Sequence, residues 1–221
     1  MKGDQAAIDR ARRTLFMGVL SDVLDDLGFR RQALHPRIRP LDEALVLVGR
    51  ARTGLYADVY HVEPGENPYE LEITLIDDLK PGEAPVLACG PSGRIAPWGD
   101  LLTTASIARQ AAGCVTDGLV RDTNRIRGMG FPVFHGGIGP LDSKGRGKVV
   151  DIDVPVECAG VRVSSGDLVF GDADGVIVIP RDAEAEALRL AAEKVEGEDH
   201  TRKALREGMA LGEVFEKYGI L

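Results

Sequence analysis

Apolar residues recur with helical spacing near the start of the chain. Residues 6–27 follow this period, with a predicted break at Gly18 and a new helix start at Ser21. Serine favours helix starts and glycine favours helix ends, so Ser21 is the expected N-cap and Gly28 the expected stop. The pattern therefore predicts two helices before the first strand.

Apolar runs of strand length fill much of the remaining chain. Runs rich in Val, Leu, Ile and Tyr predict strands at residues 44–48, 51–60, 85–89, 114–120, 131–135, 148–156, 161–163, 167–171 and 176–179. Helical spacing predicts further helices at residues 69–79, 99–112, 181–195 and 211–218, and a short helix ending near Met129. We expect a bulge or turn at Gly49 between the first two strands, and an interruption at Gly197 after the long helix.

This order of elements predicts a fold of the α/β class. Three strand-led units lie between residues 85 and 135, and a β-rich half follows them. No internal repeat, low-complexity tract or convincing linker divides the chain. We therefore expect a single α/β domain over residues 1–195 and a helical tail over residues 196–221.

Charge and cysteine content narrow the range of partners. The 221 residues carry a formal net charge of −8, which argues against nucleic acid or an anionic membrane as the main partner. No apolar run reaches transmembrane length, and the first residues lack the apolar segment of a signal peptide. The three cysteines are odd in number and widely spaced, which favours unpaired thiols and a cytoplasmic location.

Asp100 and the dipeptide Arg121-Asp122 are the main candidates for chemistry. Residues 99–102 (GDLL) open a predicted helix, and Arg121-Asp122 ends a predicted strand and opens the next helix. In α/β sheets, ligands bind beyond the carboxyl ends of strands, where helix starts offer free N–H groups. If the two strands are neighbours, the three side chains share one crevice.

These residue types suit a divalent cation and an anionic ligand. The two carboxylates are hard oxygen ligands of the kind that Mg²⁺ and Mn²⁺ prefer, and Arg121 offers a planar fork for an oxyanion. The amides of Leu101 and Leu102 would be free to bind a carboxylate, and Gly99 would let a ligand come close to the backbone. A surface ion pair next to an ordinary helix-capping aspartate is the alternative interpretation.

Other motifs are incomplete. The four histidines show neither HxH nor HExxH spacing, so a zinc site is not expected. The glycine run at residues 136–139 leads into a proline rather than a helix, which does not fit a dinucleotide-binding turn. Residues 171–175 (GDADG) place the wrong residue types at the ligand positions of a calcium loop and predict a tight turn instead.

Six stretches of the chain carry a family resemblance. They are residues 21–28 (SDVLDDLG), 49–53 (GRART), 99–102 (GDLL), 118–122 (GLVRD), 130–134 (GFPVF) and 166–176 (GDLVFGDADGV). In this order they resemble the RraA-like proteins, which include the class II 4-hydroxy-4-methyl-2-oxoglutarate/4-carboxy-4-hydroxy-2-oxoadipate aldolases. The resemblance implies a layered α/β fold with a central β-barrel-like core flanked by helices. It also implies homotrimers or homohexamers with active sites between subunits.

The resemblance also implies roles for individual residues. Asp122 and, through water, Asp100 would bind Mg²⁺ or Mn²⁺, and Arg121 would contact the oxygens of a 2-keto acid. The backbone at residues 99–102, with the amides of Leu101 and Leu102, would bind the pyruvyl carboxylate. A glutamate in the tail of a neighbouring subunit would approach the metal-bound water. Glu198 is the better match for this glutamate and Glu196 the second.

The implied activity is that of a metal-dependent carbon–carbon lyase. A small anionic 4-hydroxy-2-keto acid or diacid would be cleaved to pyruvate by retro-aldol chemistry, with oxaloacetate decarboxylation as a side activity. A water on the metal, oriented by Asp100, would take the proton of the 4-hydroxyl, and the metal and Arg121 would stabilise the enolate. The alternative is a non-catalytic regulator of the RraA type that binds an endoribonuclease.

One position departs from the family pattern. Three residues after Asp122, family members often carry an acidic residue, and this chain has Arg125. The change reverses a local charge beside the expected metal site. It would either weaken metal binding or indicate a substrate with an additional carboxylate.

Overall fold

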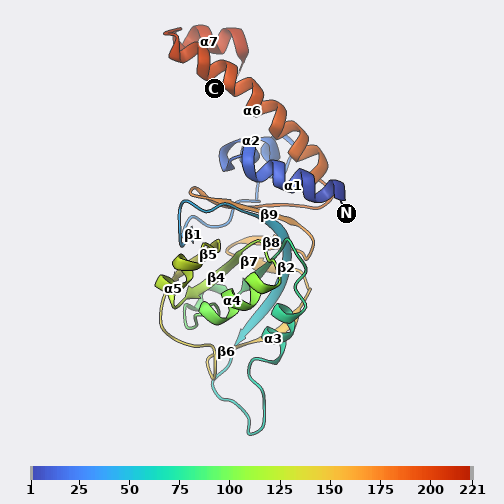
Figure 1. The fold of residues 1–221 in the computed structure, drawn as a ribbon, viewed down its shortest axis with the longest axis vertical. Coiled ribbons are helices and arrows are strands. Elements are labelled where there is room, and N and C mark those ends of the chain that lie inside the picture. Colours follow the sequence, from blue (N-terminus) through green and yellow to red (C-terminus); the bar gives the residue numbers. More distant parts are fainter. Residues whose placement is uncertain (1, 220–221) are drawn as a thin grey trace.

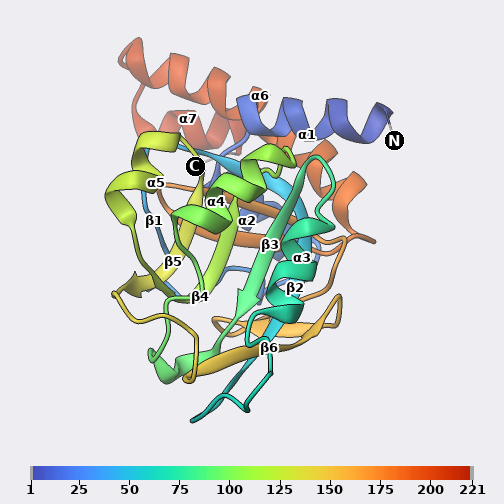
Figure 2. The same ribbon diagram turned by 60° about the horizontal axis from the view of Figure 1, so that its bottom comes forward.

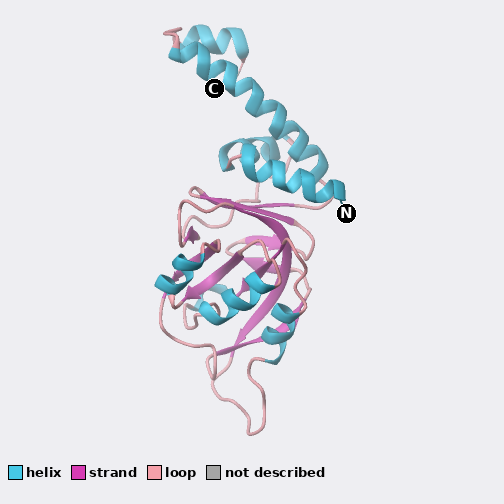
Figure 3. Cartoon of the chain, in the orientation of Figure 1, coloured by secondary structure: helices cyan, strands magenta, loops and turns pink. Residues whose placement is uncertain are grey.

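The computed structural model describes residues 2–219, which fold into a curled sheet with helices on its outer faces (Figures 1 and 3). The helices are α1 (Lys2–Thr14), α2 (Met17–Asp26), α3 (Glu70–Asp77), α4 (Asp100–Ala108), α5 (Thr123–Met129), α6 (Glu184–Arg206) and α7 (Leu211–Tyr218), with a 3-10 turn η1 (Gly90–Ser92). The strands are β1 (Arg39–Pro40), β2 (Leu47–Asp58), β3 (Glu83–Ala88), β4 (Cys114–Val120), β5 (Val133–Ile138), β6 (Gly147–Ile152), β7 (Val156–Cys158), β8 (Val161–Val163), β9 (Leu168–Asp172) and β10 (Gly175–Ile179).

The main sheet is nearly closed into a barrel. Its strands follow the order β1-β5-β4-β3-β2-β9-β10, and β6 pairs with the far half of the long strand β2. The segment just before β1 hydrogen-bonds to β10, since Leu34 N donates to Val176 O and Val178 N donates to Gln32 O, both at 2.9 Å. The two ends of the strand order therefore meet. This confirms the expected α/β fold with a barrel-like core flanked by helices.

Three apolar clusters hold the layers together. The barrel interior is filled by side chains from β2, β3, β4, β5 and β9, such as Leu47, Val86, Val115, Phe134 and Val169. Helices α1, α2 and α6 pack on the outer face of β9 and β10, and α3, α4 and α5 pack on the other side against β2, β3, β4 and β5. Figure 2 shows α3, α4 and α5 lying together over these strands. The second helical layer is the one that positions the candidate site.

The first helix break is not where the sequence placed it. The chain bends at Leu15 and Phe16, and both Gly18 and Ser21 lie inside α2, so the predictions of a break at Gly18 and a cap at Ser21 were wrong. The start of α2 is satisfied by a distant side chain, because Met17 N donates to Asp172 Oδ2 at 2.9 Å. The stop at Gly28 is confirmed by its φ of 88°.

Two other glycines were also misinterpreted. Gly49 lies inside the continuous strand β2, where an added Cβ would stand 2.6 Å from Ala112 Cβ, so this glycine allows close packing and makes no turn. Helix α6 runs without interruption through Gly197. The predicted strand at residues 148–156 divides into β6 and β7, separated by Asp153 at a φ of 58°. The predicted helix at residues 99–112 ends early, at Ala108.

Two expectations about the chain as a whole can be compared with the structure. Cys89, Cys114 and Cys158 are free, as expected from their spacing. Within residues 2–219, no helix is both long and apolar enough to cross a membrane.

Gly136 is a position where the sheet leaves no room for a side chain. A Cβ there would lie 2.3 Å from Asp117 O, a backbone atom that cannot move without disturbing β4. We expect Gly136→Ala to lower the free energy of unfolding by about 2 kcal/mol, since overpacking typically costs this much. Urea unfolding measures the change. Gly212→Ala is the control, because its Cβ would meet nothing within 4 Å, and an equal loss in both variants would contradict the packing argument.

Candidate active site

The candidate site forms where the segment before α4 runs beside the end of β4. Strands β3 and β4 are parallel neighbours, as the shared crevice required. Beyond β3, Leu119 N donates to Ile95 O and Arg121 N donates to Trp98 O, both at 3.0 Å, and Trp98 pairs with Val120 in a parallel bridge. These backbone bonds place the first turn of α4 next to Arg121 and Asp122.

Trp98 anchors the start of α4. Its ring is fully buried and stacks on Phe131 at a centroid distance of 6.2 Å. Its indole Nε1 donates to Thr103 Oγ1 at 2.8 Å, and this hydroxyl donates to Gly99 O at 2.9 Å. The buried aromatic thereby fixes the backbone at residues 99–103, and with it the direction in which the first amides of α4 point.

Gly99 is needed because Asp122 approaches it closely. Asp122 Oδ2 accepts a hydrogen bond from Asp100 N at 3.2 Å, and a Cβ on Gly99 would stand 2.7 Å from the same oxygen. Asp122 itself has φ 56° and ψ 29°, a left-handed conformation that costs a residue other than glycine on the order of 1 kcal/mol or more. The local fold holds this carboxylate against its conformational preference, as is common at functional sites.

Arg121 lies between two carboxylates. Its Nη2 is 3.2 Å from Asp142 Oδ1, and its Nε is 3.8 Å from Asp122 Oδ2. Arg125, four residues further on, reaches across to Asp100, with Nη1 at 3.3 Å from Oδ2. The Arg125 side chain is 77% exposed and the Asp100 side chain 20% exposed, so this pair lies at the mouth of the site.

A wall of hydroxyl and carboxyl groups faces these residues. Tyr69 at the cap of α3, Glu72 within α3, and Asp142 and Ser143 in the loop before β6 line a cavity of about 310 Å³. The Tyr69 hydroxyl donates to Asp142, and the Tyr56 hydroxyl donates to Glu72 Oε2 at 2.5 Å. This wall holds the loop and the helix in fixed positions opposite Arg121.

Glu72 has an unusual protonation equilibrium. Burial raises the pKa of its carboxyl from 4.5 to about 7, the Tyr56 hydrogen bond opposes the rise, and the negative charge of Asp142 adds to it. Burial also raises the pKa of Tyr69 to about 12, and the hydrogen bond to Asp142 contributes. Near neutral pH, Glu72 is therefore present in both protonation states and Tyr69 keeps its proton.

The structure brings together six of the candidate residues and leaves out the glutamates of the tail. Gly99, Asp100, Leu101, Leu102, Arg121 and Asp122 all line the cavity. Leu101 and Leu102 lie in the first turn of α4, where a helix has no internal acceptors for its amides. Glu198 lies on α6, paired with Arg202 at 2.8 Å, and within one chain neither it nor Glu196 lines this cavity. Whether a neighbouring subunit brings Glu198 here stays a prediction.

Glu72, Tyr69 and Asp142 were missed from the sequence. One signal existed for Glu72, because it shares the helical stripe of Leu75, Ile76 and Leu79, which are buried. A carboxylate in an apolar stripe indicates a buried charge with a specific partner. Asp142 gave no such signal, since it follows a glycine-rich run with no motif.

The donor set fits a hard divalent cation. Asp100 and Asp122 present only oxygen, and Mg²⁺ is commonly held by one or two carboxylates, with water and substrate completing its shell. No cluster of three or more His, Cys, Asp or Glu side chains able to hold a metal occurs in the part of the chain that the structure describes. A dedicated cage of protein ligands is thus not formed by these residues of one chain.

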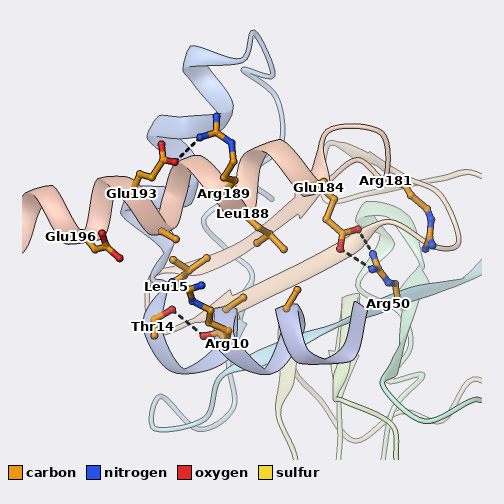
Figure 4. A pocket seen from close by; sticks show the side chains of 14 residues that line it. Arg10, Thr14, Leu15, Arg50, Arg181, Glu184, Leu188, Arg189, Glu193 and Glu196 are labelled. Carbon is orange, nitrogen blue, oxygen red and sulfur yellow. Dashed lines mark hydrogen bonds and ion pairs between the residues drawn. The ribbon is translucent and has the colours of Figure 1, made fainter. Parts of the chain in front are cut away.

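A larger cavity, of about 620 Å³, lies between α1 and α6 (Figure 4). Two pairs of its charged groups bind each other, with Arg50 Nη2 at 2.7 Å from Glu184 Oε1 and, along α6, Arg189 Nη1 at 2.6 Å from Glu193 Oε1. Its remaining lining is largely alanine and leucine. This composition offers no convergent set of reactive groups, so we place the chemistry in the smaller cavity.

Comparison with known proteins identifies the family of this chain. The family model described as RraA-like (Aldolase/RraA) matches residues 18–178. A protein of Halalkalibacterium halodurans named "Putative 4-hydroxy-4-methyl-2-oxoglutarate aldolase" is 33% identical over 206 residues, which cover 93% of this chain and 92% of that protein. The chain therefore belongs to the RraA-like family.

Solved structures show the same fold. A protein of Pseudomonas syringae pv. tomato superposes with a TM-score of 0.82 at 27% identity, covering 95% of this chain and 96% of that one. Streptomyces coelicolor RraAS2, described as an unusual member of the RNase ES inhibitor RraA family, gives a TM-score of 0.79 at 27% identity, covering 89% and 96%. The relatives thus include both proteins named as aldolases and proteins named as inhibitors.

Proposed function

We propose that this protein is a divalent-metal-dependent lyase that releases pyruvate from a 4-hydroxy-2-keto acid. The observation that carries the proposal is the convergence of Asp100, Arg121 and Asp122 at the first amides of α4. A carboxylate pair, a guanidinium and free backbone amides in one cavity match the charges of a 2-keto acid and its enolate. The aldolase name of the Halalkalibacterium halodurans relative supports the same reaction class.

The residues of the chain divide the work of binding. The amides of Leu101 and Leu102 and the positive end of α4 bind the keto acid carboxylate. Arg121, held by Asp142, directs its remaining N–H groups at the keto oxygen, where negative charge grows as the C3–C4 bond breaks. Asp100 orients a water that accepts the proton of the 4-hydroxyl while C4 becomes a carbonyl carbon. The electron pair of the broken bond becomes the pyruvate enolate, which then takes a proton at C3.

Asp122 and Asp100 are the residues that would hold Mg²⁺ or Mn²⁺. When bound there, the ion supplies Lewis-acid polarisation of the keto oxygen. Decarboxylation of oxaloacetate leaves the same enolate, so the same residues would support it as a side activity.

The reaction class is tested by metal-dependent pyruvate release. We expect the purified protein with Mg²⁺ to form pyruvate from 4-hydroxy-2-oxoglutarate, 4-hydroxy-2-oxopentanoate or oxaloacetate, and EDTA to remove at least about 90% of the rate. Coupling to lactate dehydrogenase follows the product. Restoration of the rate by excess Mg²⁺ or Mn²⁺ is the control for damage by the chelator.

Full activity in EDTA would overturn the metal requirement. No turnover of any keto acid would favour a non-catalytic regulator, the role indicated by the description of Streptomyces coelicolor RraAS2. That role predicts saturable binding of an endoribonuclease to the folded protein, which a binding titration with the purified partner measures.

A further inference from the structure

The cavity has two ends of different chemistry. Asp100, Arg121, Asp122 and the start of α4 form the end that would bind the keto acid. Tyr69, Glu72, Asp142 and Ser143 form the opposite wall, whose one part in the proposed reaction is to hold Arg121 through Asp142. A substrate held by its keto acid group extends its tail, the atoms beyond C4, toward this opposite wall.

The opposite wall is built to accept hydrogen bonds. Asp142 is held in place by Arg121 at 3.2 Å and by the Tyr69 hydroxyl, which leaves further lone pairs on its oxygens for a ligand. Glu72 is oriented by the Tyr56 hydroxyl, and Ser143 adds a hydroxyl that can donate or accept. Such groups bind hydroxyl donors well.

The charge of the wall opposes a second carboxylate. Four acidic residues line the cavity, and two of them, Asp100 and Asp122, would hold the cation. The other two, Glu72 and Asp142, lie on the opposite wall, and Arg121 is the one basic residue in the described lining. Burial raises the pKa of Glu72 most and the charge of Asp142 adds to the rise, whereas the Tyr56 hydrogen bond and the charge of Arg121 lower it. A tail carboxylate would add another negative charge beside this pair.

Arg125 does not change this balance. From the sequence, Arg125 in place of an acidic residue suggested a substrate with an additional carboxylate. In the structure, however, its guanidinium pairs with Asp100 at 3.3 Å, at the mouth of the cavity. It is not among the residues that line the cavity, and the wall that faces the substrate tail carries Asp142 and Glu72 instead.

We propose that the protein prefers 4-hydroxy-2-keto monocarboxylates with hydroxyl groups beyond C4 over the corresponding dicarboxylates, and that Asp142 and Glu72 determine this specificity. This inference rests on the proposed function for the orientation of the substrate. It replaces a diacid with a polyhydroxylated monoacid as the substrate class. Asp142 also acts as a positioning residue for Arg121.

The test compares three substrates that differ only in their tails. They are 2-keto-3-deoxygluconate (hydroxylated tail), 4-hydroxy-2-oxopentanoate (methyl tail) and 4-hydroxy-2-oxoglutarate (carboxylate tail). We expect kcat/KM for Mg²⁺-dependent pyruvate release to be at least about 10-fold higher with the hydroxylated tail than with the carboxylate tail. The ratio of the two values is the readout, because a general loss of activity cancels from it.

Two variants assign the effect to the wall. Asp142→Asn and Glu72→Gln remove charge with little change in shape, and each is expected to lower the ratio at least about 3-fold. Asp151→Asn, at an exposed position on β6, is the matched control and should leave the ratio unchanged. A wild-type preference for the carboxylate tail, or a ratio unaffected in both wall variants, would overturn the inference.

A binding measurement separates this inference from the proposed function. Shifts of Tm with each of the three compounds in Mg²⁺ rank their affinities without any turnover. The expected order of stabilisation is hydroxylated tail, methyl tail, carboxylate tail. If no compound is cleaved but this order is found, the lyase proposal fails and the specificity of the wall stands. An equal or larger shift with the carboxylate tail overturns the specificity.

Discussion

Arg121→Ala is expected to lower kcat/KM for pyruvate release about 1,000-fold. The guanidinium is the only positive side chain that lines the cavity in the described part of the chain. In the proposed reaction it stands where the enolate charge develops. Removal of one preorganised donor to a developing oxyanion typically costs about 100- to 1,000-fold, and here the donor also carries the full charge. Steady-state kinetics with the best of the tested keto acids measures the loss.

Two further variants make this result specific. Arg121→Lys keeps the charge but loses the planar fork, so an intermediate loss is expected. Arg125→Ala removes a guanidinium only four residues away, yet its side chain is 77% exposed and pairs with Asp100 at the mouth, so its rate should stay within about threefold of wild type. Equal losses in Arg121→Ala and Arg125→Ala would show that net charge matters and that the position of Arg121 does not.

The sequence was sufficient to predict that Asp100, Arg121 and Asp122 lie together in one cavity. Asp100 opens the helix that comes after β3, and Asp122 caps the helix that comes after β4; parallel neighbouring strands bring such positions together. The sequence did not reveal what holds them so close. The ring of Trp98 and the missing side chain of Gly99 allow the contact between Asp100 N and Asp122 Oδ2, and both effects depend on packing.

Features that depend on distant partners were missed. Ser21 had the right chemistry for an N-cap, but the start of α2 is satisfied by Asp172 from the end of β9. The Asp142 carboxylate joins a loop to Tyr69, 73 residues earlier in the chain. Local propensity describes neighbours in sequence, whereas these contacts exist only after the sheet has closed.

Gly49 and Gly197 illustrate the same limit for backbone signals. Glycine was interpreted at both positions as a local interruption, and at both positions the element continues. At Gly49 the reason is the approach of Ala112 and of Gly82 O to the strand. A single sequence cannot distinguish a glycine needed for a turn from one needed for contact.

Glu72→Gln is expected to weaken the pH dependence of stability. Between pH 5 and pH 8, the free energy of unfolding should fall by about 2.5 kcal/mol more in the wild type than in Glu72→Gln. The pKa of Glu72 is raised from 4.5 to about 7 in the folded protein, chiefly by burial. Between these values the folded state binds the proton and the unfolded state does not, so unfolding releases it. The raised pKa of Glu72 therefore stabilises the folded wild type fully below pH 4.5, and this contribution is lost as the pH rises through 7. A pKa difference of one between the folded and unfolded states corresponds to about 1.4 kcal/mol.

The measurement is urea unfolding of both proteins from pH 5 to pH 8 in EDTA, which excludes stabilisation by a bound metal. Glutamine is uncharged at all these values, and its side-chain oxygen can accept the Tyr56 hydrogen bond. Glu70→Gln is the matched control, because Glu70 lies on the same helix and is exposed, so its difference from wild type should not change over this range. A pH-independent difference in Glu72→Gln would mean that Glu72 is charged throughout. In that case the wall opposite Arg121 would carry two full negative charges at neutral pH.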